Sequence, residues 1–370
     1  MGTTTGRPFI KGLELSRFLY EEAVGPLMAT HFAGLPYSAA LLGSGSDVLG
    51  FDTPQSMDHD WGPRLLVFLG EADHARWRDE IDKGLERYLP HDCHGYPTRF
   101  EFYEGGTTAM AEDGQEPAHH RVMLLTVRSF FWDCLAFDPQ GELRAVDWLT
   151  FPEQRLRGVT AGQVFHDGLG ELEPVRARLQ YYPRDVWLYL LAAQWRRIGQ
   201  EEAFMGRCGQ VGDELGSCLV AARLVRDLMK LCFLMERQYA PYSKWFGSAF
   251  AQLACAGQLA PTFASVLGAG FWQERERRLV AAYEAVARMH NALGVTEPLP
   301  TNMFHYFERP FLVIGGDGFA DTLRAVIVSE EVQALPEYLG AVDQLVDSTD
   351  VLERPARCRR LEMLWQESDA

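Results

Sequence analysis

The stretch LLGSGSDVLGFDTPQSMDHDWGPRLLVFL, residues 41–69, decides how we interpret the N-terminal part of the chain. It begins with a glycine–serine turn at Gly43–Ser46 and continues through a polar loop. Asp58-His59-Asp60 then open an apolar strand that includes the continuous run Leu65–Leu69, a pattern typical of a buried strand. Because side chains alternate between the two faces of a strand, we expect Asp58 and Asp60 to project to one side, about 7 Å apart.

Two carboxylates held this closely repel each other unless a cation lies between them. Mg²⁺ takes oxygen ligands and is usually bound by one or two protein carboxylates together with waters and phosphate oxygens. The turn at Gly43-Ser44 offers backbone N–H groups that can approach a phosphate closely, because glycine has no Cβ. A turn that binds phosphate, beside two carboxylates that bind Mg²⁺, is the smallest set of groups needed to promote nucleophilic attack on a nucleoside triphosphate.

The first part of the chain alternates segments of helical and strand character, which predicts a small mixed sheet covered by helices. Apolar residues recur at helical spacing in two segments, residues 11–32 and Glu71–Tyr88. Strand-like runs are Leu65–Leu69, Thr98–Tyr103 and Arg121–Val127. Ser38–Leu42 leads into the glycine–serine turn, and Gly105–Ala118 is expected to be a polar loop.

The signals change to helical ones after Pro183. The expected helices are Asp185–Arg197, Glu214–Tyr239, Lys244–Ala254, Phe271–Met289 and Gly318–Ile327. We therefore predict an α+β protein with a mixed-sheet domain over residues 1–175, followed by an all-helical domain over residues 176–370.

Composition excludes several classes of protein. Hydrophobic residues make up 47% of the chain, which excludes wholesale disorder. The net charge of −16 makes the chain a poor general binder of nucleic-acid backbones or anionic membranes, although a local basic cleft is compatible with it. The seven cysteines form no CxxC, and we expect neither a disulfide framework nor a structural zinc site. The N-terminus lacks the features of a secretory signal, and no apolar run is long enough to span a bilayer, so we expect a cytoplasmic protein.

Leu42, Gly43, Ser44, Asp58 and Asp60 resemble the signature of the nucleotidyltransferase superfamily related to DNA polymerase β. In that signature an apolar residue, Gly, and Gly or Ser precede a polar spacer and Asp-x-Asp or Asp-x-Glu. The plan of a small catalytic sheet domain followed by a helical domain is similar to that of kanamycin-type nucleotidyltransferases.

A closer likeness is to a bacterial family of unknown function within that superfamily. Its members carry a GSGSD…D-H-D-W run and a later Y-P…Q-W…A-P-Y-x-K-W run. The matching residues here are Gly43–Asp47, Asp58–Trp61, Tyr182-Pro183, Gln194-Trp195 and Ala240–Trp245.

The resemblance implies a magnesium-dependent enzyme that transfers a nucleoside monophosphate to a hydroxyl of an acceptor and releases pyrophosphate. AMP from ATP is the expected group, and a small-molecule acceptor is favoured over a macromolecule. Asp58 and Asp60 would be catalytic metal ligands, and the residues expected to bind the nucleotide are Gly43, Ser44, Gly45, Ser46 and Asp47. The alternative is a nucleotide-binding regulatory protein that keeps the fold but has no catalytic activity.

Asp47 has a second interpretation, since its side chain could simply fix the turn through an Asx bond. Superfamily enzymes usually place a third carboxylate on a neighbouring strand. Glu101, between two phenylalanines, is the first candidate for it, and its alternative is a solvated residue on the outer face. Asp133 and Asp147 are weaker candidates, and the residues do not identify the general base.

Two lysines of the helical part, Lys230 and Lys244, stand in apolar and aromatic surroundings. In enzymes of similar plan, basic residues of the helical domain reach the triphosphate oxygens, so we expect both lysines to bind the nucleotide. The alternative is that they are lysines at a helix edge with their ammonium groups in water. We expect His59 and Trp61 to be packed in the sheet. Analogy with relatives of this plan also leaves a homodimer open.

Overall fold

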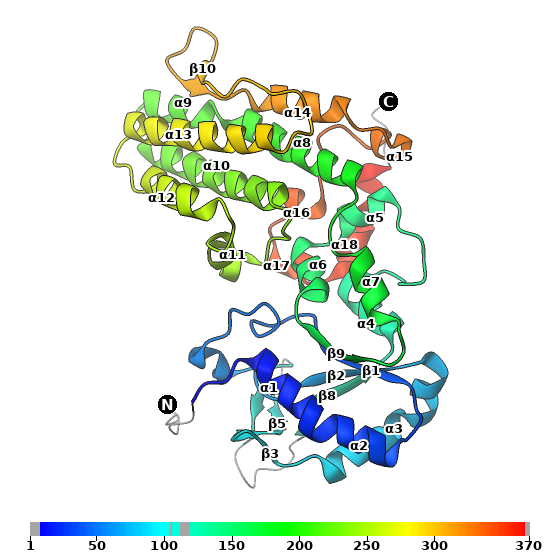
Figure 1. The fold of residues 1–370 in the computed structure, drawn as a ribbon. Coiled ribbons are helices and arrows are strands. Elements are labelled where there is room, and N and C mark those ends of the chain that lie inside the picture. Colours follow the sequence, from blue (N-terminus) through cyan, green and yellow to red (C-terminus); the bar gives the residue numbers. More distant parts are fainter. Residues whose placement is uncertain (1–7, 104–105, 112–118, 367–370) are drawn as a thin grey trace. The chain divides into compact units, whose positions relative to one another are not determined.

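The computed structural model describes residues 8–103, 106–111 and 119–366 (Figure 1). The fold is α+β, with small mixed sheets and a large helical part, as predicted. Its contacts divide the chain into two compact units. The first runs up to Glu142 and includes Arg155–Gln180, and the second comprises Leu143–Gln154 and the chain from Tyr181 onward. The predicted domain boundary after residue 175 falls within α7 (Leu172–Arg178). The observed units divide after Gln180, and also between Gln154 and Arg155, within α6 (Glu153–Thr160).

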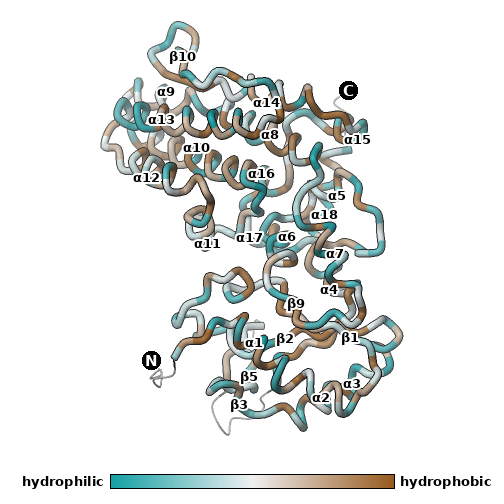
Figure 2. The backbone as a smooth tube through the Cα atoms, viewed as in Figure 1, coloured by the Kyte–Doolittle hydropathy of each residue, from teal (hydrophilic) through white to brown (hydrophobic). Residues whose placement is uncertain are grey.

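A four-stranded sheet forms the centre of the first unit. Its strands follow the order β8 (Val122–Leu125), β2 (Leu65–Leu69), β1 (Tyr37–Leu41) and β9 (Gln163–Asp167). Strands β2 and β8 are parallel, whereas β1 is antiparallel to both of its neighbours. All five residues of β2 are buried, which explains their continuous apolar run, and Figure 2 shows the hydrophobic colouring along β1, β2 and β8.

The predicted helix over residues 11–32 is present, but a π turn interrupts it. α1 (Gly12–Leu19) leads through the π turn Tyr20–Val24 into α2 (Gly25–His31). Because Pro26 has no N–H to donate and its ring crowds the preceding turn, the helical spacing widens just before it. The other helices whose residues fall wholly in this unit are α3 (Glu71–Tyr88), α4 (Val127–Leu135) and α7.

Short strands at one side of the first unit correct one prediction. β5 (Arg99–Phe102) lies between β6 (Thr108–Met110) and β7 (His119–His120), and β3 (Asp92–Cys93) pairs with β4 (Tyr96–Pro97). The segment Gly105–Ala118 was expected to be a polar loop, yet it contains β6, whose residues pair with β5. Gly105 and residues 112–118 lie outside the described residues.

The second unit is built mainly of helices. The longer ones are α8 (Arg184–Glu201), α9 (Phe204–Gln210), α10 (Glu214–Met235), α11 (Ser243–Phe250), α12 (Ala256–Leu267), α13 (Trp272–Ala292) and α14 (Gly316–Ala325). The short ones are α5 (Ala145–Thr150), α15 (Glu330–Gln333), α16 (Val342–Leu345), α17 (Thr349–Leu352) and α18 (Pro355–Arg360). Two short strands, β10 (Phe304–His305) and β11 (Leu312–Val313), pair with each other in this unit. Helix α8 is buried along most of its length, because α10 and α14 pack against it.

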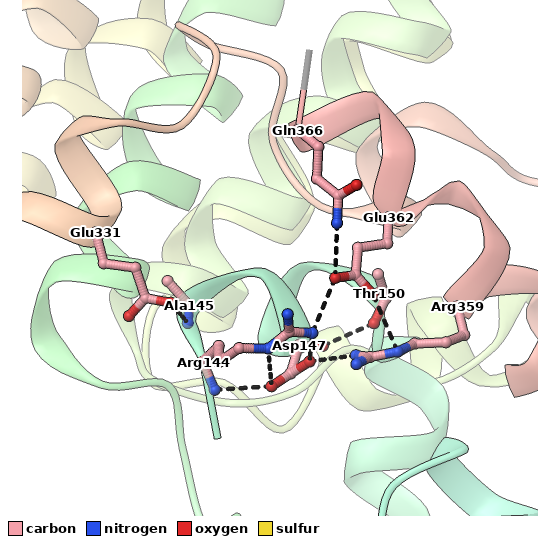
Figure 3. Close-up of polar contacts among 8 residues, drawn as sticks. All are labelled: Arg144, Ala145, Asp147, Thr150, Glu331, Arg359, Glu362 and Gln366. Atoms are coloured by element: carbon pink, nitrogen blue, oxygen red, sulfur yellow. Dashed lines mark hydrogen bonds and ion pairs between the residues drawn. The ribbon is translucent and has the colours of Figure 1, made fainter. Parts of the chain in front are cut away.

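An ion-pair network ties α5 to the C-terminal helices of the second unit (Figure 3). The carboxylate of Asp147 accepts hydrogen bonds from the backbone N–H and the guanidinium of Arg144, at 2.7 and 2.8 Å, and from the guanidinium of Arg359. Glu362 pairs with both arginines. Asp147 was a weak candidate for a catalytic carboxylate, but the structure uses it to hold the helical unit together.

We expect Asp147→Asn to weaken the protein at neutral pH and to have little effect in acid. Burial alone would raise the pKa of Asp147, but the donors on Arg144 and Arg359 lower it below its ordinary value. A carboxylate with a lowered pKa contributes stability above its unfolded pKa and loses it as pH falls through the folded pKa. Urea unfolding should show a loss of about 2 kcal/mol at pH 7 and a smaller loss near pH 3. Equal losses at both pH values would contradict this assignment.

Candidate functional site

The bend at Gly43–Asp47 follows directly on β1. Gly43 and Gly45 have φ values of 93° and 141°, which L side chains rarely adopt. The N–H of Gly43 donates to the carbonyl of Gly158 in α6 at 2.9 Å. The N–H groups of Ser44, Gly45 and Ser46 donate to no described residue. The bend therefore presents successive free backbone donors, the arrangement that binds anions at phosphate-binding turns.

Arg64, the residue before β2, holds the bend in place. Its guanidinium donates to both carboxylate oxygens of Asp47, at 2.9 and 2.8 Å, and to the carbonyl of Ser44 at 2.9 Å. The side chain of Asp47 is only 2% exposed and that of Arg64 12%. Burial works against the charge on Arg64, but the Asp47 carboxylate outweighs it, so the pKa of Arg64 is raised. Asp47 also accepts the N–H of Val48, which makes it a fixed part of the turn.

Two further arginines bring positive charge to this bend. Arg155 in α6 donates to the hydroxyl of Ser44 at 2.8 Å. Arg121 precedes β8, and its carbonyl accepts the N–H of Leu65, which places its backbone beside the start of β2. Burial and the nearby charge of Arg64 lower the pKa of Arg121 to about 10, against the opposing effects of Asp60 and Asp47. The Nη1 atom of Arg121 is buried and has no hydrogen-bond partner among the described residues.

Asp60 lies near two members of this arginine cluster (Arg64, Arg121 and Arg155), since its charge acts on both Arg64 and Arg121. Its Oδ1 accepts the N–H and the hydroxyl of Thr108 in β6, at 2.9 and 3.1 Å, and its own N–H donates to the Thr108 carbonyl. Oδ2 accepts no hydrogen bond from a described residue. Thr108 thus fixes one carboxylate oxygen of Asp60 and leaves the other available.

The expected position of the Asp58–Asp60 pair on a strand is wrong. β2 begins only at Leu65, Asp58 ends a 3₁₀ helix over Pro54–Asp58, and Asp60 is left-handed with φ 53°. The intervening residues explain the difference, because Pro63 has no N–H for a ladder and Gly62 has φ 133°, where a Cβ would lie 2.8 Å from Phe100. The alternation argument therefore does not apply to this pair.

Asp58 and its neighbours have different surroundings. Asp58 is exposed, and its Oδ1 contacts the ring nitrogen Nδ1 of His59 at 2.9 Å. His59 is itself exposed, which corrects the expectation that it packs in the sheet. Trp61 is buried, stacks on Phe9, and donates its indole N–H to buried Asp52 at 3.0 Å. Asp58 is thus more solvated than Asp60.

Glu101 lies on β5, as expected, and accepts a hydrogen bond from the Tyr103 hydroxyl at 2.9 Å. In the antiparallel register Glu101 is opposite Ala109, and Phe102 is opposite Thr108. Since neighbouring side chains on a strand point to opposite faces, Glu101 projects from the face opposite to the Thr108 side chain that binds Asp60. Asp133 is exposed on α4. The structure thus does not bring either carboxylate into a described contact with Asp60.

Both candidate lysines belong to the second unit. Lys230 on α10 is partly buried, and its ammonium donates to the carbonyl of Asp343. Burial lowers the pKa of Lys230, with Asp343 acting against this effect. Lys244 is exposed near the start of α11, with its Nζ 5.2 Å from the ring centre of Trp245. Contact of either lysine with a nucleotide stays a prediction.

The arginines are the residues that sequence reasoning missed. Arg64 could have been noticed, because it is the last residue before the buried strand in the quoted stretch. Nothing in the sequence links Arg121 or Arg155 to the bend, since each lies in a separate segment of the chain. The pairing of β8 with β2 brings Arg121 near the bend, and α6 brings Arg155 to it.

We expect Gly158→Ala to disturb the bend. A Cβ at Gly158 would lie 2.5 Å from the Gly43 carbonyl oxygen, so α6 or the bend must move. The cost should be about 1–3 kcal/mol in urea unfolding, despite the better helix propensity of alanine. Gly247→Ala in α11 is the matched control, because a Cβ there meets nothing within 4 Å, and it should be neutral or stabilising. Equal stability of the two variants would refute this packing argument.

One segment of the chain is similar to a known protein family. Residues 148–246 match DUF4037, a domain of unknown function. The matched segment contains the Tyr182-Pro183 and Ala240–Trp245 runs but neither the bend nor Asp60. No curated protein matches the chain.

A crystal structure of a nucleotidyltransferase-like protein from Exiguobacterium sibiricum 255-15 is similar to this chain at 12% identity. The similarity covers 74% of this chain and 77% of that one, with a TM-score of 0.33. A TM-score of this size does not establish a common fold.

Among the described residues, no helix combines the length and the apolar character needed to cross a membrane.

Proposed function

We propose that the first unit is a magnesium-dependent nucleotidyltransferase. It transfers a nucleoside monophosphate, with AMP from ATP as the expected case, to a hydroxyl of an acceptor, and pyrophosphate leaves. A small-molecule acceptor is favoured. The observation that carries the proposal is the bend with free N–H groups at Ser44, Gly45 and Ser46, surrounded by three arginines and close to Asp60.

The electrostatics of the site favour an anionic ligand. Asp47 neutralises Arg64, the charge of Asp60 acts on Arg64 and Arg121, and Arg155 adds a positive charge at the Ser44 hydroxyl. A buried nitrogen without a partner, such as Nη1 of Arg121, costs free energy that a phosphate oxygen would recover. In a chain with a net charge of −16, this local gathering of arginines is a feature that phosphate binding explains.

The carboxylates present fit a magnesium ion that shares its ligands with the substrate. Among the described residues, no group of three or more His, Cys, Asp or Glu side chains could hold a metal ion. Mg²⁺ commonly takes only one or two carboxylates and completes its shell with water and phosphate oxygens. Asp60, through its free Oδ2, and exposed Asp58 would supply these ligands. When bound, the ion neutralises the charge on the phosphates.

The protein's own groups hold the triphosphate in the proposed reaction. The N–H groups of the bend donate to phosphate oxygens, and Arg64 fixes the bend through the Ser44 carbonyl. Arg121 and Arg155 stabilise the negative charge that grows on the departing pyrophosphate. The general base is left unassigned. The role of Glu101 as a third carboxylate and the binding of the nucleotide by Lys230 and Lys244 stay predictions. A cytoplasmic location and a homodimer likewise remain predictions.

Labelled nucleotides test the proposal. We suggest incubation of the protein with MgCl₂, an extract of small metabolites and α-labelled ATP, GTP, CTP or UTP in turn, followed by mass analysis of the products. The expected result is one metabolite that gains the mass of a nucleotide, with an equal amount of pyrophosphate. Nucleotide binding without pyrophosphate release would instead identify a regulatory nucleotide-binding protein, and absence of nucleotide binding would overturn both functions.

A further inference from the structure

Two cysteines of the second unit lie against each other where α10 contacts α12. The seven cysteines of the chain are all free thiols. Cys232 lies on α10 and is fully buried, whereas Cys255 comes directly before α12 and is partly exposed. Their side chains form a hydrogen bond with each other. The two thiols are therefore neighbours in space, although the whole of α11 lies between them in the chain.

Glu236 holds the backbone of Cys255 beside α10. This residue follows the last residue of α10, about one turn after Cys232. Its two carboxylate oxygens accept the N–H groups of Ala254 and Cys255, at 2.7 and 2.8 Å. The position of Cys255 next to the end of α10 is thus fixed by contacts that do not involve either thiol.

Aromatic packing also keeps α10 and α12 together. Phe250, the last residue of α11, contacts Phe233 of α10 and Phe263 of α12, with ring centres 6.3 and 5.6 Å apart. All three rings are buried. Because a close-packed core leaves its elements little room to shift, the two thiols stay near each other.

The surroundings give the two thiols different roles. The pKa of Cys232 is raised well above its ordinary value, first by the hydrogen bond with Cys255 and then by burial. A hydrogen bond that raises the pKa of an acid is one in which the acid donates its proton, so Cys232 donates to the sulfur of Cys255. Burial is instead the main cause that raises the pKa of Cys93 and of Cys134 to about 12. Cys255, partly exposed and with a donor beside its sulfur, is the thiol that a dissolved reagent reaches first.

We propose that Cys232 and Cys255 form a reversible disulfide when the protein meets a peroxide. The sulfur of Cys255 attacks one oxygen of hydrogen peroxide, the O–O bond breaks, and the products are the sulfenic acid of Cys255 and a water molecule. The sulfur of Cys232 then displaces hydroxide from the Cys255 sulfur, and the hydroxide takes the Cys232 proton and leaves as a second water. Two thiols are oxidised to one disulfide, and one peroxide is reduced to two water molecules.

The disulfide fastens the start of α12 to α10. Thiols that already form a hydrogen bond need only small side-chain rotations to reach the S–S bond length of about 2 Å. A cross-link also restricts the unfolded chain, so the oxidised protein should resist unfolding better than the reduced protein. A thiol reductant should reverse both effects. The inference goes beyond the proposed function and does not depend on nucleotidyl transfer.

Peptide mapping of the full chain tests the proposal. The protein is reduced, freed of reductant, exposed to hydrogen peroxide and treated with N-ethylmaleimide. Trypsin then places the two cysteines in separate peptides, because it cleaves after Lys244. We expect a cross-linked pair of these peptides that is lighter than their sum by two hydrogen atoms and that dithiothreitol separates. Oxidation of Cys255 without this cross-link, or no oxidation of either thiol, would overturn the proposal.

Variants assign the cross-link and its effect. Peroxide should raise the urea midpoint of the unmodified chain, and dithiothreitol should cancel the rise. Cys255→Ser and Cys232→Ser should each lose both the cross-link and the rise. Cys218→Ser removes another partly exposed thiol, on α10, and is the matched control that should keep both. If Cys232→Ser does not fold, the partly exposed Cys255→Ser decides alone, and a rise that persists in it would contradict the assignment.

Discussion

Asp60→Asn should abolish nucleotidyl transfer and leave the fold intact. Asparagine keeps an oxygen that accepts the N–H and hydroxyl of Thr108, so the link to β6 survives while the negative charge is lost. Loss of a metal-binding carboxylate removes several kcal/mol of transition-state stabilisation, and about 4 kcal/mol corresponds to roughly a 1,000-fold lower rate. The measurement is the rate of pyrophosphate release at saturating nucleotide and MgCl₂, together with the unfolding midpoint in urea.

Two further variants sharpen this prediction. Asp58→Asn should also reduce the rate strongly, because Asp58 is the second proposed metal ligand. Asp79→Asn, at an exposed residue of α3, is the control and should change neither the rate nor the unfolding midpoint. Full activity of Asp60→Asn would end the proposed mechanism, whereas a shifted unfolding midpoint would show that the variant acts through the fold.

Asp47→Ala should destabilise the first unit by about 3–5 kcal/mol. The carboxylate of Asp47 is the two-point partner of the nearly buried Arg64 guanidinium, and its removal leaves a buried charge without compensation. The bend should also lose its shape, because Arg64 then has no second anchor beside the Ser44 carbonyl. Urea unfolding of the full chain at pH 7, followed by circular dichroism, measures the loss.

The double variant Asp47→Ala/Arg64→Met separates the buried charge from lost packing. It should be less destabilised than Asp47→Ala alone, since the uncompensated guanidinium is gone. Asp79→Ala, at an exposed ion pair of 3.8 Å with Arg78, should change stability by less than about 0.5 kcal/mol. A loss below about 1 kcal/mol in Asp47→Ala would show that the ion pair does not hold the bend.

Local sequence patterns were enough for the main elements of the fold. Leu65–Leu69 and Glu71–Tyr88 coincide with β2 and α3 at both ends. Apolar periodicity also predicted α8, α10 and α13, because a helix needs one continuous buried stripe and its spacing shows in the chain. The helices α9 and α12 were missed, since glycines in α9 and Pro261 within α12 are residues that usually end helices.

Only part of the candidate site could be predicted from local sequence patterns. The glycine–serine bend and the two aspartates stand close together in the chain, and they define the hypothesis. The strand geometry assigned to the aspartates was wrong, because Gly62 and Pro63 precede a strand that begins only at Leu65. Asp60 instead forms hydrogen bonds with Thr108 of β6, a contact that exists only in the folded chain. Whether the two aspartates act together on a metal stays a prediction.

Taken alone, the sequence determined the α+β class, the position of the buried β2 strand and the bend after β1, because each depends on residues that are neighbours along the chain. Only the tertiary structure decided that Arg64, Arg121 and Arg155 gather around that bend and that Asp60 attaches to β6. It also decided that the thiol of Cys232 on α10 meets the thiol of Cys255, which Glu236 holds at the start of α12. The physical reason is that charge and hydrogen-bond complementarity depends on distance in space, whereas periodicity reports only the local backbone.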